Sequence, residues 1–248
     1  MVFHAKKSMI RADRIYSVYS NDDSIKKRST MLFFLFSLAC SRAPVDDQWS
    51  HNSVVQIKDS FTSVFLIEHE ELVLIDSGFN RKSAPIASYL EESGRGLEDI
   101  KHIFFTHGHG DHCGGLDNFP NATLYAHEDE IALLQEETGR TDFTAITEEE
   151  KMVGDLRIKP YKVDGHSSGN LVYVINNVLI MGDSGQSYKD GSVSPVSDNF
   201  SDDPELASES LEALSAQLVD EQIEWVAFSH SGALEGLDAL NNYQHETK

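Results

Sequence analysis

Apolar residues after position 52 fall mostly in short runs, and Gly, Asn, Asp or Ser ends many of them. Runs of about four to eight residues with such boundaries predict buried β-strands. We expect strands at 53–58, 62–68, 71–75, 100–105, 123–126, 156–163, 170–175, 178–181 and 225–228. The pair Asn176-Asn177 predicts a turn between two of these strands.

Other segments repeat apolar residues at helical spacing, which predicts helices at 83–93, 127–137, 204–219 and 234–243. We expect Ser83 to cap the start of the first helix, and Gly94 lies just past its end. The third helix should bury one stripe of leucines, formed by Leu206, Leu211, Leu214 and Leu218. Strands and helices alternate in both halves of the chain, which favours a layered α/β fold.

The most apolar run of the chain is 31–39, and it is too short to span a bilayer, which needs about 20 apolar residues in a helix. Lys26-Lys27-Arg28 precede it, as basic residues precede the apolar core of a signal peptide. Ser37-Leu38-Ala39-Cys40 resembles a bacterial lipobox, which implies lipidation of Cys40. We therefore expect a signal peptide at 1–40, a polar linker at 41–52 and the folded domain at 53–248.

This interpretation places the protein outside the cytoplasm. It would be periplasmic in a Gram-negative bacterium and held to the membrane only by its lipid anchor. The alternative is a cytoplasmic protein in which 31–39 is a buried strand or helix. Met9 or Met31 could also be the true start, and a start at Met31 would remove the basic residues.

The net charge argues against nucleic acid as a partner. The 248 residues suffice for one substantial core, and they carry a formal net charge of −21. Residues 41–248 are more acidic still, with 13 basic and 38 acidic side chains. Such a body repels polyanions, although two bound divalent cations could still make a positive pocket for a small anionic substrate.

The two cysteines, Cys40 and Cys113, lie far apart in the sequence and imply no disulfide framework. Cys113 directly follows a histidine. We expect it to be a small buried residue at a tight turn, with a ligand or reactive thiol as the alternative.

The densest cluster of metal-ligand side chains follows the strand predicted at 100–105. It reads Thr106-His107-Gly108-His109-Gly110-Asp111-His112. Imidazoles and a carboxylate suit zinc or another first-row metal ion. The two glycines let neighbouring side chains point at different ions. Because one segment cannot complete a metal site, further ligands are expected elsewhere.

Three further donors each follow an apolar run and stand beside Gly or Ser. They are His166 after Gly165, Asp183 after Gly182 and His230 after Ser229. Loops at strand ends are where functional residues concentrate. The remaining histidines are expected to be ordinary surface or core residues, namely His4, His51, His69, His102, His127 and His245.

Taken together, these segments resemble the metallo-β-lactamase-fold hydrolase superfamily over roughly residues 53–240. The resemblance rests on the ordered donors above and on Leu74-Ile75-Asp76-Ser77-Gly78 near their start. It implies an αββα sandwich, a compact single domain and two divalent metal ions. Zinc is the expected metal, with iron or manganese as alternatives.

The resemblance also implies a role for each donor. One ion would be held by His107, His109 and His166, the other by Asp111, His112 and His230, and Asp183 would bridge them. A shared carboxylate and hydroxide lower the repulsion between two cations, and that hydroxide would be the nucleophile. Asp111 is the expected catalytic residue, which orients the water and moves its proton. Asp76 is expected to orient a ligand histidine from behind.

The sequence says less about the bond that is cut. Four polar residues near the ligands are expected to contact substrate, namely Ser167, Ser168, Asn170 and Ser184. The Gly-, Ser- and Asp-rich segment 185–203 should be a long functional loop. Asp183 in the bridging position resembles the glyoxalase and lactonase-like branches, whereas β-lactamases of the fold typically carry cysteine or serine there. Only 65 residues follow Asp183, too few for the added helical domain of glyoxalase II-like enzymes.

A small ester, lactone, thioester or amide is therefore the expected small-molecule substrate. Three alternatives stay open: a β-lactam hydrolase, an iron-dependent oxidoreductase like the persulfide dioxygenases of this fold, and a non-catalytic metal-binding protein. The complete second ligand set argues against a mononuclear iron enzyme. The intact donor set as a whole argues against a protein that has lost catalysis.

Overall fold

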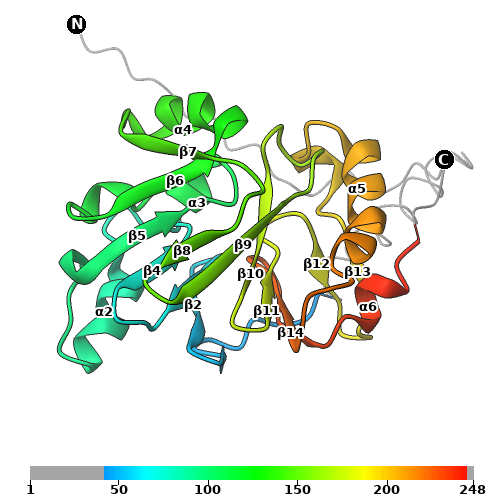
Figure 1. The fold of residues 1–248 in the computed structure, drawn as a ribbon, viewed down its shortest axis with the longest axis horizontal. Helices are drawn as coiled ribbons and strands as arrows, with labels where there is room; N and C mark the ends of the chain where they lie inside the picture. The colour runs from blue at the N-terminus through cyan, green and yellow to red at the C-terminus, as the bar shows by residue number, and fades with distance from the viewer. Residues whose placement is uncertain (1–41, 245–248) are drawn as a thin grey trace, which may run out of the picture. The chain divides into compact units, whose positions relative to one another are not determined.

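The computed structural model describes residues 42–244 (Figure 1), so the expected signal segment and Cys40 lie outside the described residues. Two large sheets form its centre. The first contains β1 (Ser50–His51), β2 (Val54–Asp59), β3 (Thr62–Ile67), β4 (Leu72–Ile75), β5 (Ile100–Phe104), β6 (Thr123–His127) and β7 (Phe143–Ile146), in this order. The second contains β8 (Lys151–Val153), β9 (Leu156–Lys162), β10 (Leu171–Ile175), β11 (Val178–Ile180), β14 (Trp225–Ala227) and β15 (Leu234–Glu235).

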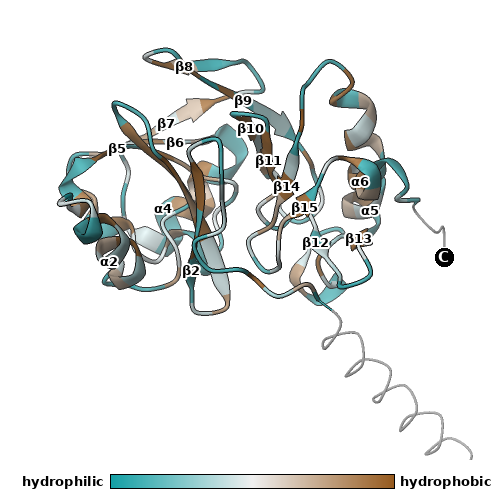
Figure 2. Cartoon of the chain, turned by 90° about the horizontal axis from the view of Figure 1, so that it is seen from below, coloured by the Kyte–Doolittle hydropathy of each residue, from teal (hydrophilic) through white to brown (hydrophobic). Residues whose placement is uncertain are grey.

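Helices cover the outer face of each sheet. In Figures 1 and 2, α2 (Ala84–Glu92) and α4 (Ile131–Thr138) lie on the side of the first sheet. On the side of the second sheet lie α5 (Pro204–Gln217) and α6 (Asp238–Asn241). The very short α3 (Gly110–Cys113) lies within the histidine-rich loop. The layers follow the order helix, sheet, sheet, helix, and the expected αββα sandwich is confirmed.

Three hydrophobic cores hold these layers together. One lies between the first sheet and its helices and includes Leu74 and Leu90. The second lies between the sheets, where Phe65, Phe104 and Tyr173 pack. The third joins the second sheet to α5 through residues such as Leu211. Figure 2 shows the hydrophobic colour concentrated on the strands.

The sequence of each central strand explains why both of its faces are buried. Successive side chains of a strand point to opposite faces, so a continuous apolar run can contact two cores. In β3, Val64 and Leu66 face the helices, whereas Phe65 and Ile67 face the other sheet. The four buried residues of β4 divide in the same way.

The chain's expected loops contain strands that the apolar pattern did not predict. β7 carries only exposed or half-buried residues, and in β8 only Val153 is buried, so neither segment gives a long apolar run. The expected loop 185–203 contains the hairpin of β12 (Gln186–Ser187) and β13 (Val193–Ser194) and the short 3₁₀ helix η4 (Asp198–Phe200). The apolar pattern did not predict these strands, because backbone pairing defines them rather than the burial of alternate residues.

Three expectations about the helices are corrected. The helix expected from 234 begins as strand β15, which pairs with β14, and only Asp238–Asn241 is helical. Leu206 is 39% exposed, and Ala207 takes the buried position at the start of α5. Ser83 has a φ of 49° and makes no capping hydrogen bond; its hydroxyl donates instead to the carbonyl of Gly115.

The described part of the expected linker packs against the folded domain. Arg42 forms a β-bridge with Tyr188, and the ring of Trp49 lies 5.3 Å from that of Trp225. β1 adds a short strand to the first sheet. Residues 42–51 therefore belong to the fold rather than to a free tether. Within residues 42–244, no helix combines the length and the apolar character needed to cross a bilayer.

Candidate metal centre

The seven predicted ligands converge at one edge of the sandwich. The histidine-rich loop follows β5, and the loop of His166 joins β9 to β10. Asp183 follows β11, and His230 follows β14. β4 and β5 run parallel in the first sheet, as do β11 and β14 in the second. Because the carboxyl ends of parallel strands meet at the same edge, loops from both sheets meet there.

Two groups of donors occupy this edge. In the first, the ligand atoms of His107, His109 and His166 all lie within 4.8 Å of one another. The Nε2 atoms of His107 and His166 are 3.1 Å apart. In the second group, Asp111, His112 and His230 meet the same limit. Asp111 Oδ2 lies 3.3 Å from Nε2 of His230 and 3.6 Å from Nε2 of His112.

Asp183 lies between the two groups. Its Oδ1 is 3.2 Å from His112 Nε2, and its Oδ2 is 3.2 Å from His230 Nε2. The same Oδ2 is 3.8 Å from Nε2 of His166, in the first group. The structure thus brings together all seven residues that the sequence singled out.

The donor set fits divalent metal ions. The buried atoms His112 Nε2 and Asp183 Oδ1 make no hydrogen bond. Buried polar atoms without a partner are costly, and a coordinated cation would satisfy both. Four of the seven side chains are buried, while His109, Asp111 and His230 are partly exposed and mark the side open to solvent.

The protein environment shifts the histidine pKa values of the two groups in opposite directions. Burial lowers the pKa of His107 well below its usual value and lowers that of His166 to about 4. Burial also opposes the charge of His112, but the carboxylates of Asp183 and Asp76 raise its pKa well above normal. Likewise, hydrogen bonds to Asp111 and Asp183 outweigh burial and raise the pKa of His230 to about 9. These histidines hold the pKa of Asp183 well below its usual value, although burial opposes this.

Asp76 connects the turn after β4 to the histidine-rich loop. Its carboxylate accepts hydrogen bonds from the backbone N–H and the hydroxyl of Thr106, each at 2.8 Å. It also pairs with Nδ1 of His112 at 2.8 Å. Asp76 therefore lies behind the candidate ligand His112, in the position that the sequence predicted.

Of the four residues expected to contact substrate, only Ser168 is exposed. Its hydroxyl lies 3.5 Å from the carbonyl of Asp129. Ser167, Asn170 and Ser184 are buried, and the Asn170 amide donates to the Ser184 hydroxyl. Asn170 and Ser184 thus tie two loops together, and the expected contacts of these residues with substrate stay a prediction.

Cys113 is buried, and its thiol lies 3.7 Å from the carbonyl of Gly108. Burial raises the pKa of this thiol to about 12, so it is not a reactive thiolate. Among the described residues, it belongs to no donor group of the centre. The interpretation as a small buried residue is the one that fits.

Two aromatic residues at the open side were missed by the sequence analysis. Phe61 is 56% exposed and Phe79 is 47% exposed, and their rings lie 5.0 Å apart. The ring of Phe61 stacks on the imidazole of His230, and His230 Nδ1 pairs with the carbonyl of Phe61 at 2.8 Å. Phe61 occupies the turn between β2 and β3. An aromatic residue in a predicted turn was the available signal for an exposed ring.

The buried carboxylate of Glu130 was also missed. It accepts hydrogen bonds from the backbone N–H groups of Gly108 and Gly169, at 2.8 and 2.7 Å. In the sequence, Glu130 stands in the acidic stretch Glu128-Asp129-Glu130, which predicts a solvated helix face. The available signal was a glycine in each of the two ligand loops, Gly108 and Gly169, because glycines allow close packing against a neighbouring helix.

Comparisons with known proteins agree with this geometry. The family model of the Metallo-beta-lactamase superfamily matches residues 57–230. A hydroxyacylglutathione hydrolase of Aliivibrio salmonicida is 29% identical over 136 residues, which cover 53% of this chain and 49% of that protein. The probable metallo-hydrolase YybB of Bacillus subtilis is 27% identical over 135 residues, covering 48% and 59%. The matches thus span about half of these curated relatives.

Solved structures show the same fold at low sequence identity. A B3 metallo-beta-lactamase with an active-site glutamic acid superposes with a TM-score of 0.60 and 18% identity, covering 81% of this chain and 86% of that one. A flavo di-iron protein from Thermotoga maritima has a TM-score of 0.60 and 15% identity, covering 79% and 60%. At such identities the likeness concerns the fold alone.

Proposed function

The chain belongs to the Metallo-beta-lactamase superfamily, and on this basis we propose that it is a hydrolase that uses two divalent metal ions, with zinc as the expected metal. The observation that carries the proposal is the pair of three-residue donor groups with Asp183 between them. Relatives named as hydrolases support the class of reaction. When bound, the ions would supply Lewis acidity and would lower the pKa of a coordinated water.

We assign the donors to the ions as the two groups suggest. His107, His109 and His166 would hold one ion, and Asp111, His112 and His230 would hold the other. Asp183 would serve both, because its two oxygens face histidines of different groups. The low pKa values of His107 and His166 favour neutral imidazoles, the form that binds a metal ion, whereas the raised pKa values of His112 and His230 mean that these two would lose a proton on binding.

Asp111 is the residue to which we assign proton transfer. It is the more exposed of the two carboxylates, with 22% of its side chain accessible against 9% for Asp183. A hydrogen bond from His230 lowers the pKa of Asp111 despite the opposing effect of partial burial. The low pKa keeps Asp111 ionised at the open side, where it can accept a hydrogen bond from a water molecule and orient it; its position there is what supports the transfer of the proton.

The substrate that we propose is a small ester, lactone, thioester or amide with an apolar portion. Phe61 and Phe79 support the apolar portion because they expose two rings beside His230. A thioester comes first among these because several relatives are named hydroxyacylglutathione hydrolases. Cleavage of a β-lactam stays a second candidate because a B3 metallo-beta-lactamase shares the fold.

Metal analysis and a hydrolysis screen test the proposal. We expect about two zinc ions per chain and activity on at least one of a thioester, a lactone, an ester or a chromogenic β-lactam. Asp111→Asn should lose most of the activity, whereas the exposed Asp117→Asn should not. One iron per chain, or full activity of Asp111→Asn with its metals bound, would contradict the proposal or the role of Asp111.

We also propose that the protein is exported and lipid-anchored through Cys40. The support is the basic and apolar pattern before that residue and its likeness to a lipobox. Attachment by an acyl chain would keep the hydrolase at the membrane surface.

A further inference from the structure

A single buried carboxylate links the two loops that carry the first donor group. Glu130 is 1% exposed. Its Oε2 accepts a hydrogen bond of 2.8 Å from the backbone N–H of Gly108, the residue between His107 and His109. Its Oε1 accepts the N–H of Gly169, in the loop of His166, at 2.7 Å. Both of these partners are backbone amides, so the carboxylate acts on the backbone of the loops.

The chain accommodates this carboxylate at both loops by having glycine there. A Cβ atom on Gly169 would lie 3.0 Å from Cγ of Glu130 and 2.9 Å from Nδ1 of His127. A Cβ atom on Gly108 would lie 2.8 Å from the side chain of Leu133, in the first turn of α4. Both loops therefore approach the start of α4 more closely than a larger residue would permit.

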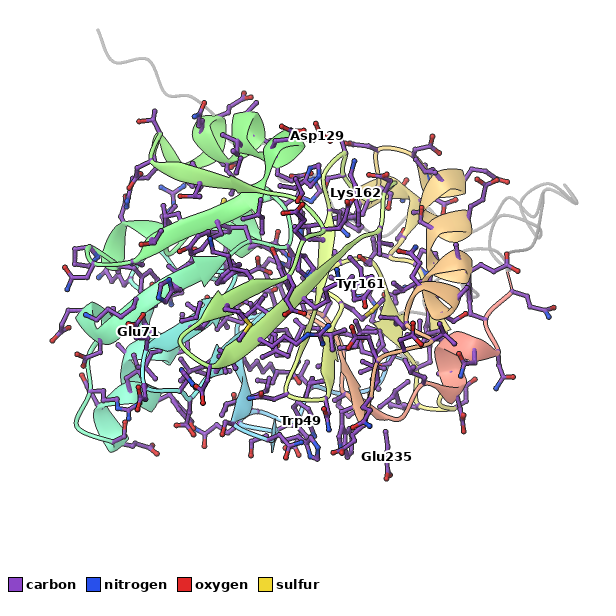
Figure 3. All side chains as sticks on the ribbon, in the orientation of Figure 1. Trp49, Glu71, Asp129, Tyr161, Lys162 and Glu235 are labelled. Carbon is purple, nitrogen blue, oxygen red and sulfur yellow. The ribbon has the colours of Figure 1, made fainter. Side chains whose placement is uncertain are left out.

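Neighbouring contacts hold the segment before α4 against the second sheet's loop. Asp129 pairs with Lys162, at the end of β9, at 3.1 Å, and Figure 3 labels both residues. The Ser168 hydroxyl contacts the carbonyl of Asp129. These outer contacts are exposed, whereas the Glu130 contacts are buried. Hydrogen bonds to a buried, charged acceptor are the stronger kind.

We propose that Glu130 is a positioning residue that sets the distance between His166 and the pair His107 and His109. This inference rests on the proposed function, because it assigns these three histidines to one ion. The histidines come from loops of different sheets, and Glu130 contacts the backbone of both loops. Nothing in its hydrogen bonds reaches the loop of His230. Asp111 and His112 of the second group also belong to the histidine-rich loop, but the loop of His166 carries a donor of the first ion alone. Glu130 should therefore affect the first ion more strongly than the second.

The test replaces only the acceptor character of this side chain. Glu130→Gln keeps the size of the side chain, but one amide N–H₂ would face a backbone N–H and lose that hydrogen bond. Glu128→Gln is the matched control, because it makes the same substitution on an exposed residue of the same short 3₁₀ helix. Gly169→Ala is a second probe, since the added methyl group would push against His127, Asp129 and Glu130 and so separate the loop of His166 from this segment.

Zinc affinity is measured by competition with a chelator in two backgrounds of the full chain. His230→Ala removes a donor of the second ion, and His109→Ala removes a donor of the first. In the His230→Ala background, Glu130→Gln should weaken zinc binding about 10- to 100-fold, as loss of a residue that supports ligands typically does. In the His109→Ala background it should change zinc binding less than about threefold. Glu128→Gln should change neither.

Three outcomes overturn the inference or its premise in distinguishable ways. Equal weakening in both backgrounds, with a lower melting temperature of the metal-free protein, would show that Glu130 only stabilises the fold. Unchanged zinc affinity of Glu130→Gln in the His230→Ala background would reject the positioning role of Glu130. If Glu130→Gln does not fold, the same measurement on Gly169→Ala takes its place. A wild type that binds no divalent metal would instead overturn the proposed function.

Discussion

Nδ1 of His112 lies 2.8 Å from Oδ2 of Asp76, and both side chains are buried. This pairing holds a proton on Nδ1, so that Nε2, which faces Asp183, is the nitrogen that a metal ion would take. The same carboxylate accepts the hydroxyl of Thr106, whose oxygen lies 2.9 Å from Nδ1 of His107. Asp76 thereby selects the tautomer of His112 directly and that of His107 through Thr106, so that both Nε2 atoms point into the centre.

The first prediction follows from this arrangement. Asp76→Asn keeps the backbone conformation, because asparagine tolerates the φ of 62° found here. Its amide cannot accept from all three donors, so we expect zinc affinity to fall about 10- to 100-fold at both ions. Thr106→Val should weaken only the ion held by His107. Competition with a chelator measures both, and Asp117→Asn is the exposed control. Unchanged zinc affinity in Asp76→Asn would contradict the role of Asp76.

Much of this centre was predictable because its signals are local. The donors stand beside glycines at the ends of apolar runs, and the fold follows from strands that are apolar on both faces. Glu130 was not predictable in the same way. Its burial depends on where α4 packs against two loops distant in sequence, which an acidic stretch does not reveal.

The elements that the sequence missed are those whose stability is set by their neighbours. β15 begins where helical spacing predicted a helix, because pairing with β14 outweighs the local preference of Leu234–Glu235. Leu206 lies outside the leucine stripe because Ala207 takes the buried position at the start of α5, against the loop at Gly165. Tertiary contacts decide the structure of these segments, and the local sequence pattern does not reveal such contacts.

The second prediction concerns the aromatic pair at the open side. Phe61→Ala should raise the KM for substrates with an apolar acyl group about fivefold and leave kcat nearly unchanged. Losing about 40 Å² of apolar contact costs about 1 kcal/mol, and the same loss would affect ground state and transition state alike. The hydrogen bond of His230 uses the backbone carbonyl at Phe61, so the substitution keeps it.

The control for this prediction is Met152→Ala, which removes an equally exposed side chain from β8. Steady-state kinetics with a matched pair of acetyl and longer-chain substrates provides the measurement. A KM that rises equally for both substrates would show that Phe61 does not contact the acyl chain.

The third prediction concerns Cys40. In a bacterial host that processes lipoproteins, the wild type should be recovered in the membrane fraction. Cys40→Ser should move it to the soluble exported fraction, because a thioether-linked lipid can no longer form. Cys113→Ala is the matched control: its thiol is buried in the domain, so this variant should stay with the membrane. Identical fractionation of Cys40→Ser and wild type would remove the anchor from the proposal.

The fourth prediction is a pH dependence of stability. The carboxylate of Glu221 accepts two hydrogen bonds from Arg157, each at 2.8 Å, and one from the Tyr161 hydroxyl at 2.7 Å. These bonds tie the segment after α5 to β9. The Arg157 hydrogen bonds are the main cause that lowers the pKa of Glu221 from 4.5 to about 2.

Because the folded pKa lies below the unfolded one, this carboxylate stabilises the fold fully above pH 4.5 and loses its effect as the pH falls toward 2. Glu221→Gln should therefore lower the free energy of unfolding of the metal-free protein by about 1 kcal/mol at pH 7, the range of a partly exposed ion pair. The difference should shrink below pH 4.5 and vanish near pH 2. Urea unfolding at several pH values measures it, with the exposed Glu209→Gln on α5 as the control. A difference that stays constant from pH 7 to pH 2 would show that the substitution acts through packing rather than through charge.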